Sequence, residues 1–313
     1  MTSRIMFGFA SLRRIGRVLV AAACFCAASA FAQDKSPAET ELKSALEAAR
    51  PLAQKGPAEI KLIDQANLKL PAGFVFVPST PAARILTAMG NRTSTNLLGM
   101  IFPGEGTDGD WFIVARFDPA GYIKDDDARE WNADELLKNL KDGTEAVHEE
   151  RTKRGIPEME VIGWIEKPAY DASSRRLVWS MSTRTKGAPA DSEEGVNYNT
   201  YALGRQGYVS LNLVTGLRTV DAEKPMAKKM LAALEFDEGK RYADFNSSTD
   251  KVAEYGLAAL VAGVAAKKLG LFALIGVFLV KFAKVFLLGG VGVAALAAKW
   301  WKGRKAKPDD EPR

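Results

Sequence analysis

Nine short runs of the chain have the length and the apolar residues that are typical of β-strands. The predicted strands cover residues 58–62, 67–70, 74–77, 95–102, 110–117, 159–166, 174–185, 196–203 and 208–214. The runs are interpreted as strands that pair mainly antiparallel. A mainly antiparallel sheet follows from this pattern.

Three segments are predicted to be helical. Residues 37–54 follow Ser36, a capping residue, and begin with Pro37, which suits the first helical position. Asn132 caps a longer helix that runs to about Arg151, and a third helix covers residues 222–234. Many antiparallel strands with a few helices predict an α+β fold for residues 33–250, a length that suits a single domain.

Residues 196–214 predict one hairpin in detail. The connection Gly204–Gly207 places Leu203 opposite Tyr208, so the numbers of opposed residues add up to 411. One face of the hairpin is then mostly apolar, and it carries Tyr198, Thr200 and Ala202 opposite Leu213, Leu211 and Val209.

The other face of this hairpin is polar. Asn199 is expected to lie opposite Asn212, with Tyr201 and Ser210 beside them. Asn199, Tyr201 and Asn212 are therefore candidates for lining a polar ligand groove. The alternative interpretation is an ordinary sheet face exposed to water, since antiparallel sheets commonly have one polar side.

The N-terminal segment has the three parts of a secretory signal peptide. Four arginines within the first 17 residues precede an apolar run, 18–31, that closes with Ala30-Phe31-Ala32. Cleavage after Ala32 would leave Gln33 as the mature N-terminus. Lipid attachment at Cys24 is the alternative, but Val20-Ala21-Ala22-Ala23 resembles a lipobox poorly.

Cleavage would remove Cys24 and Cys26, which are the only two cysteines. Disulfides, thiolate catalysis and cysteine-bound zinc or iron–sulfur sites are then excluded from the mature chain. His148 is the only histidine, so a multi-histidine metal site is excluded as well. It is expected to be a surface residue late in the predicted long helix.

The net positive charge of the chain comes from its two ends. Residues 33–250 contain 28 basic and 34 acidic residues, whereas residues 251–313 contain 11 basic and four acidic ones. The central domain is therefore acidic, and the basic residues belong to targeting and anchoring. This distribution argues for a membrane as partner and against nucleic acid.

Residues 269–298 form an apolar stretch interrupted only by Lys281 and Lys284. A helix of this length measures about 45 Å and exceeds the roughly 30 Å of a bilayer core. Lysines are tolerated near the edge of the bilayer but are costly at its centre. The expected crossing is therefore residues 282–301, with residues 251–281 as an apolar juxtamembrane helix.

Trp300 and Trp301, followed by the basic tail 302–313, are expected to mark the cytoplasmic boundary of this crossing, with Lys281 and Lys284 at the opposite one. This predicts a single-pass protein of the inner membrane with its main domain in the periplasm. A second crossing by residues 255–280 is the alternative, but it would return the basic tail to the exported side.

Small residues repeat every four positions within the predicted crossing, at Gly290, Ala294 and Ala298. Such a stripe lets two helices approach closely in lipid, so self-association through this stripe is one possible contact between copies. Small residues that merely fill an apolar helix are the alternative.

Asp125-Asp126-Asp127 and the nearby Asp108 and Asp110 are the strongest candidates for a cation site. However, the spacing of an EF-hand loop and its closing glutamate are absent. A solvated loop that leads into a helix is the preferred interpretation. No phosphate-binding glycine motif is found in the domain, and the sequence predicts no cofactor.

Several long strings of the chain resemble a bacterial family of predicted membrane-anchored proteins, the domain of unknown function 2167 family. They are GDWFIVARFDPAGYIKDDD, ADELLKNLKDGTEAVHEERTKRG, VIGWIEKPAYD with RRLVWS, VNYNTYALGRQGYVSLNLVT and EGKRYADFNSSTDKVAEYGLAALV. The resemblance covers most of the mature chain and implies an exported, membrane-anchored protein. It implies no activity and no catalytic residues.

Two classes of function remain. The first is a non-enzymatic binding or interaction module in the bacterial envelope, which the missing nucleophile, thiol and histidine apparatus favours. The second is a hydrolase that uses carboxylates alone, for instance on an envelope glycan. A pair of carboxylates about 5–10 Å apart in a deep cleft would favour the hydrolase.

Overall fold

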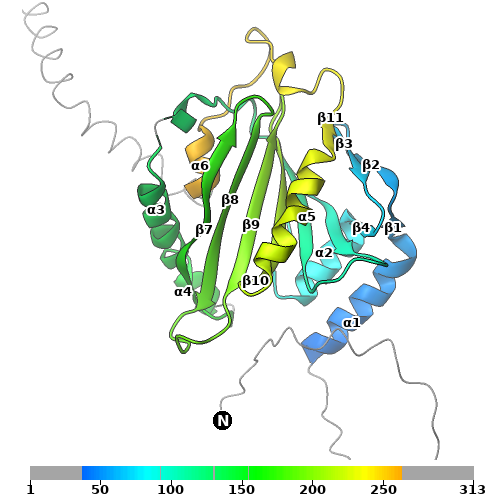
Figure 1. Cartoon of the computed structure of the whole chain (residues 1–313), viewed down its shortest axis with the longest axis vertical. Helices are drawn as coiled ribbons and strands as arrows, with labels where there is room; N and C mark the ends of the chain where they lie inside the picture. Colours follow the sequence, from blue (N-terminus) through cyan, green and yellow to red (C-terminus); the bar gives the residue numbers. More distant parts are fainter. Residues whose placement is uncertain (1–36, 92, 130, 154, 263–313) are drawn as a thin grey trace, which may run out of the picture. The chain divides into compact units, whose positions relative to one another are not determined.

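The computed structural model describes residues 37–91, 93–129, 131–153 and 155–262, and an eight-stranded sheet dominates it (Figure 1). The strand order is β1-β4-β5-β6-β10-β9-β8-β7, and every neighbouring pair is antiparallel. The strands are β1 (Gln54–Lys55), β4 (Phe74–Pro78), β5 (Leu97–Pro103), β6 (Phe112–Asp118), β7 (Met159–Asp171), β8 (Arg176–Thr185), β9 (Gly195–Leu203) and β10 (Tyr208–Gly216).

A second, smaller sheet and one helix cover one face of the large sheet. The small sheet has the order β11-β3-β2, formed by β11 (Leu234–Phe236), β3 (Ala66–Leu70) and β2 (Ala58–Leu62). Helix α5 (Val220–Ala232) lies beside it across β9 and β10 (Figure 1). The domain is therefore layered, which confirms the predicted α+β class with a large antiparallel sheet.

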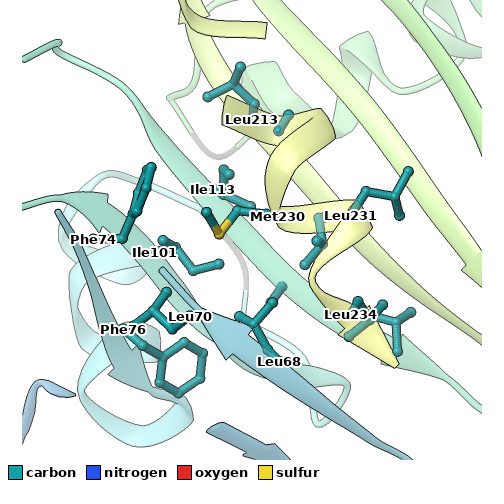
Figure 2. Close-up of a cluster of buried hydrophobic side chains, with 14 of the residues drawn as sticks. Leu68, Leu70, Phe74, Phe76, Ile101, Ile113, Leu213, Met230, Leu231 and Leu234 are labelled. Atoms are coloured by element: carbon teal, nitrogen blue, oxygen red, sulfur yellow. The ribbon is translucent and has the colours of Figure 1, made fainter. Parts of the chain in front are cut away.

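The main core fills the space between these layers. Figure 2 shows Leu68 and Leu70 of the small sheet facing Phe76 and Ile101 of the large sheet, with Met230 of α5 beside them. Leu68, Ile101 and Met230 are completely buried. Alternate residues of each strand point into this layer, so the period of two in the sequence is the direct cause of the core.

Helices cover the opposite face of the large sheet. Helices α1 (Pro37–Ala49) and α2 (Ser79–Ala88) contribute Ala45 and Ile85 to a second apolar cluster with Met100 and Val114 of the sheet. Helix α3 (Ala133–Glu145) packs against β7, and α6 (Leu257–Ala262) contacts α3. The short elements are α4 (His148–Lys153) and the 3-10 turns η2 (Arg50–Leu52), η3 (Asp126–Arg129) and η4 (Tyr242–Asp244).

The predicted hairpin is confirmed residue by residue. Leu203 lies opposite Tyr208 and Asn199 opposite Asn212, with the register continuing to Gly195 and Gly216. Val209, Leu211 and Leu213 are fully buried, as the predicted apolar face requires.

Three predicted boundaries are wrong. The long helix predicted to reach Arg151 ends at Glu145, and α4 starts separately at His148. The helix predicted to end at Leu234 stops at Ala232, because Leu234 begins β11 and pairs with Leu68. The helix predicted to continue to residue 54 ends at Ala49, and Pro51 lies in the 3-10 turn that follows it.

None of the helices in the described part of the chain is both long and apolar enough to span a bilayer. The predicted crossing 282–301, the tail 302–313 and the signal segment 1–32 lie outside the described residues. The same holds for Ala32, Gln33, Lys281, Lys284, Trp300 and Trp301, and for the stripe of Gly290, Ala294 and Ala298.

Candidate functional site

A cavity of about 460 Å³ lies where the ends of β8 and β9 meet β11 and η4. Its volume falls within the range of about 300–1,000 Å³ that is usual for small-molecule sites. The lining residues are Ser174, Arg175, Arg176, Ala202, Leu203, Leu234, Glu235, Phe236, Arg241, Tyr242 and Ala243. We call this space the arginine cavity, after the three arginines on its wall.

Arg176 reaches the cavity because of its position in β8. It lies opposite Ala202 on the face of the sheet that the small sheet covers, and its Nη2 donates to the carbonyl oxygen of Leu234 at 3.3 Å. Arg241 follows β11 and is exposed at the start of η4. Among the described residues, no carboxylate lies within ion-pair distance of the guanidinium of Arg176 or Arg241.

Among the described residues of the cavity wall, Glu235 is the only acidic one, and its charge is already neutralised. Glu235 accepts two hydrogen bonds from Nζ of Lys69, at 2.8 and 2.7 Å. The cavity therefore keeps a net positive charge, although the domain as a whole is acidic. Arginine in such a site binds carboxylate or phosphate through paired hydrogen bonds.

The rest of the wall is apolar. Leu203 and Leu234 are buried, and Phe236 stands against Gly204 at the end of the β9 strand. A Cβ atom on Gly204 would lie 2.4 Å from the Phe236 ring, so glycine is required for this close approach. The cavity thus combines cationic side chains with an apolar surface.

Arg175 and Tyr242 are held in the cavity wall by Asp125. The Asp125 carboxylate pairs with the guanidinium of Arg175 and accepts from the hydroxyls of Tyr170 at 2.7 Å and Tyr242 at 3.2 Å. The guanidinium of Arg175 also lies 4.7 Å from the centre of the Tyr242 ring. Asp125 thus joins the loop after β6, the end of β7 and η4.

Burial raises the pKa of the Asp125 carboxyl, but the Tyr170 hydroxyl and the Arg175 guanidinium lower it by more. The pKa of Asp125 in the folded protein is therefore lower than its pKa in the unfolded chain, which is about 3.9. A carboxyl group whose pKa is lowered by folding stabilises the folded protein at pH values above its pKa in the unfolded chain. This stabilisation is lost as the pH falls through the pKa of the group in the folded protein.

We therefore expect the free energy of unfolding to fall as the pH drops below about 4, with part of this fall due to Asp125. Urea unfolding measured from pH 2 to pH 7 would show it. The variant Asp125→Asn should be less stable at pH 7 and should show a weaker loss towards low pH. An unchanged pH dependence in Asp125→Asn would contradict the role of this carboxylate.

The other two aspartates of the acidic run do not join Asp125 around a common point. Asp127 caps α6, since its Oδ1 and Oδ2 accept from the backbone amides of Leu257 and Ala258 at 3.1 and 3.0 Å. Over the residues that the structure describes, no group of three or more potential ligands could hold a metal ion. The preferred interpretation, a solvated loop, is nevertheless incomplete, because Asp125 and Asp127 have specific structural partners.

The predicted ligand-facing residues lie together, but outside the arginine cavity. Nδ2 of Asn212 donates to Oδ1 of Asn199, and the Tyr201 hydroxyl donates to the carbonyl oxygen of Leu260 in α6 at 3.3 Å. Asn199 is only 7% exposed, so the alternative interpretation as a water-exposed polar face is wrong for this residue. Of these three residues, Tyr201 contacts α6, while Asn199 and Asn212 bond to each other within the sheet.

His148 is not on the surface, which corrects the prediction. Its side chain is buried because the chain breaks between α3 and α4 and turns the imidazole inward. Nε2 donates to the carbonyl oxygen of Met159 at 2.8 Å, and Nδ1 lies 3.3 Å from the carboxylate of Glu158. His148 therefore ties α4 to the start of β7.

Sequence reasoning missed the arginine cavity. Arg175 is the last residue of the turn between β7 and β8, and Arg176 begins β8, whereas Arg241 comes some 65 residues later in the chain. Only the pairing of β11 with β3 and the bridge between Gly204 and Arg241 bring them together. The dipeptide Arg175-Arg176 at a predicted strand start was the one local signal.

Two solved structures share limited similarity with the chain. The solution structure of cyanobacterial PsbP (CyanoP) from Synechocystis is 11% identical, with a TM-score of 0.35, and the match covers 59% of this chain and 91% of that chain. A mutant of the protein Mog1 is 10% identical, with a TM-score of 0.31 and coverages of 57% and 94%.

No curated protein shows significant sequence similarity to the chain. The sequence profile of a family described as "Protein of unknown function (DUF2167)" matches residues 54–292, which is most of the chain and includes all the residues that line the arginine cavity. The chain therefore belongs to the DUF2167 family.

Proposed function

We propose that the domain is a non-enzymatic binding module that holds a small amphipathic anion in the arginine cavity. The observation that carries the proposal is the position of Arg176 and Arg241. Both guanidinium groups line a cavity of suitable size without a carboxylate partner among the described residues. A ligand with an acidic head and an apolar body would match both parts of the wall.

The charge balance of the domain supports a specific anion site. Residues 33–250 are acidic overall, so a cluster of arginines is not a consequence of general basicity. Glu235 is paired with Lys69, and Arg175 is paired with Asp125, which fixes the position of its guanidinium in the cavity wall. Arg176 and Arg241 remain to pair with the ligand.

The cavities of the described domain give less support to a carboxylate-dependent hydrolase. The arginine cavity has one carboxylate on its wall, Glu235, and a second cavity of about 440 Å³ has one, Glu59. A hydrolase of this kind needs two carboxyl groups that flank the scissile bond.

A buried carboxylate elsewhere also lacks the surroundings of a catalytic group. Glu223 is 6% exposed and accepts from the hydroxyls of Thr215 and Thr219. Thr215 is itself only 2% exposed, and Glu223 lines neither of the two cavities. These hydrogen bonds fix the first turn of α5 to the end of β10.

The cellular location is part of the proposal. The signal-like segment 1–32 and the apolar segment 282–301 support a domain displayed on the periplasmic side of the inner membrane and anchored by one crossing. The module would then meet its ligand in the envelope, close to the membrane surface.

The proposal predicts that the protein binds hexyl phosphate more tightly than inorganic phosphate or hexanol. We expect Arg176→Gln and Arg241→Gln each to weaken this binding by about 10-fold, because each removes hydrogen bonds from a charged donor to an anion. Isothermal titration calorimetry of the full chain in lipid nanodiscs measures the affinity, with empty nanodiscs as the blank. Hexanoate in the same assay tells whether the site prefers phosphate or carboxylate.

Arg84→Gln is the matched control, since it removes an exposed arginine of α2 that pairs with Glu41. It should leave the affinity for hexyl phosphate unchanged. Equal affinities for hexyl phosphate in the wild-type protein and in both cavity variants would contradict the proposal, as would an absence of binding by every probe.

A further inference from the structure

Strand β2 is an edge strand with a groove beside it. In the described part of the chain, β3 is its only neighbour in the small sheet. Residues 59–63 line a cavity of about 440 Å³ together with residues of the large sheet that include Phe76, Pro78 and Leu98. The backbone groups on the outer edge of β2 are therefore available to another strand.

The residue that follows β2 is unusual. Ile63 is 50% exposed and has a φ of 53°, in the left-handed region that β-branched residues rarely adopt. A large apolar side chain is thus presented to solvent at the end of an open strand edge and on the wall of the groove. Strained and exposed residues of this kind are concentrated at functional surfaces.

The charges on the exposed face of β2 are self-complementary. Ala58, Ile60 and Leu62 point towards the core, while Glu59 and Lys61 are exposed. When two identical strands pair antiparallel about Ile60, the numbers of opposed residues add up to 120, so Glu59 meets Lys61 and Lys61 meets Glu59. Opposite charges in directly opposed positions stabilise a sheet.

We propose that two copies of this chain associate through their β2 strands in this antiparallel register and form a continuous six-stranded small sheet. The two-fold axis passes beside Ile60 of each copy. Ile63 follows the last paired residue of β2, so this register brings it to the end of the second copy's β2, next to Pro57.

The charge pattern continues into each copy. Glu59 lies opposite Lys69 of β3, and Lys69 in turn holds Glu235 of β11. Pairing with a second copy would place Glu59 between Lys69 of its own copy and Lys61 of the second copy. Lys61 has the neutral Asn67 opposite it within its own sheet, so no cross-strand carboxylate of the described small sheet competes for its charge.

Charge reversal tests this contact with full-length chains that carry two different affinity tags. Differently tagged wild-type copies should co-purify from membranes in mild detergent. When both copies carry Lys61→Glu, or both carry Glu59→Lys, each opposed pair becomes repulsive. We expect co-purification to fall by about 2- to 30-fold, the effect of losing two cross-strand ion pairs.

A mixture of one copy with Lys61→Glu and one with Glu59→Lys should restore co-purification to the wild-type level, because both opposed pairs are again of opposite sign. A folding defect would not be rescued in this way. Lys138→Glu, on the exposed surface of α3, is the matched control and should change nothing.

A second measurement reads the register directly. In the variant Glu59→Cys/Lys61→Cys, oxidation in membranes should give a disulfide-linked product of twice the chain mass, since opposed Cβ atoms lie about 4.5–5.5 Å apart. The unmodified chain under the same conditions should not give it. The proposal is overturned by co-purification that Lys61→Glu does not weaken, by a mixture that shows no rescue, or by a crosslink to a different protein.

Discussion

Gly207→Ala is expected to destabilise the domain by about 2–6 kcal/mol, the sum of backbone strain and a steric clash. Gly207 closes the turn between β9 and β10 with a φ of 154°, and a Cβ atom there would lie 1.9 Å from the carbonyl oxygen of Asp118. Since that oxygen belongs to the backbone, no side-chain rotation relieves the clash. Urea unfolding of the full chain, followed by pulse proteolysis, measures the loss.

Gly90→Ala separates strain from clash. Gly90 also has a positive φ, 79°, but nothing lies within 4 Å of the position its Cβ would take. It should cost only about 1–2 kcal/mol, the penalty of the left-handed conformation alone. Equal losses in the two variants would show that the contact between Gly207 and Asp118 is not as close as described.

Leu211→Ala is expected to cost about 2–5 kcal/mol, because it leaves a cavity between the large sheet and α5. Leu211 is completely buried at the centre of the main core, on the face predicted from the hairpin pattern. The same unfolding experiment measures the effect. Leu217→Ala, at a position 39% exposed, should change stability by no more than about 0.5 kcal/mol.

Most strands of the large sheet and the hairpin of β9 and β10 could be predicted, because their signals are local, whereas the strand order could not. In residues 196–214 the alternation of side chains and the two glycines of the turn both indicate one register, and the structure confirms it. The same holds for Asn132, whose side chain accepts from the amides of Asp134 and Glu135 and caps α3 as predicted. Strands with one buried face and capped helices leave such signals.

The missed features depend on contacts between distant parts of the chain. Leu234–Phe236 looks like the end of a helix, and it becomes a strand only because β3 offers an open edge. His148 looks like a surface residue until the break after Glu145 turns it towards Met159. The arginine cavity was missed for the same reason. Arg241 reaches it only because β11 pairs with β3 and the segment after β11 bridges to Gly204.

The acidic run 125–127 illustrates the limit of assigning function from composition. Three consecutive carboxylates suggest a cation site, yet Asp125 fixes the wall of the arginine cavity and Asp127 fixes the start of α6. The same short loop therefore holds both the proposed ligand site and α6, the last helix of the described residues.

If the arginine cavity binds an amphipathic anion, a crystal structure of the protein with hexyl phosphate should show the ligand there. We expect the phosphate group within hydrogen-bond distance of the guanidinium groups of Arg176 and Arg241, and the hexyl chain against Leu203 and Phe236. Hexyl phosphate bound elsewhere on the domain, with the arginine cavity filled by water alone, would contradict it.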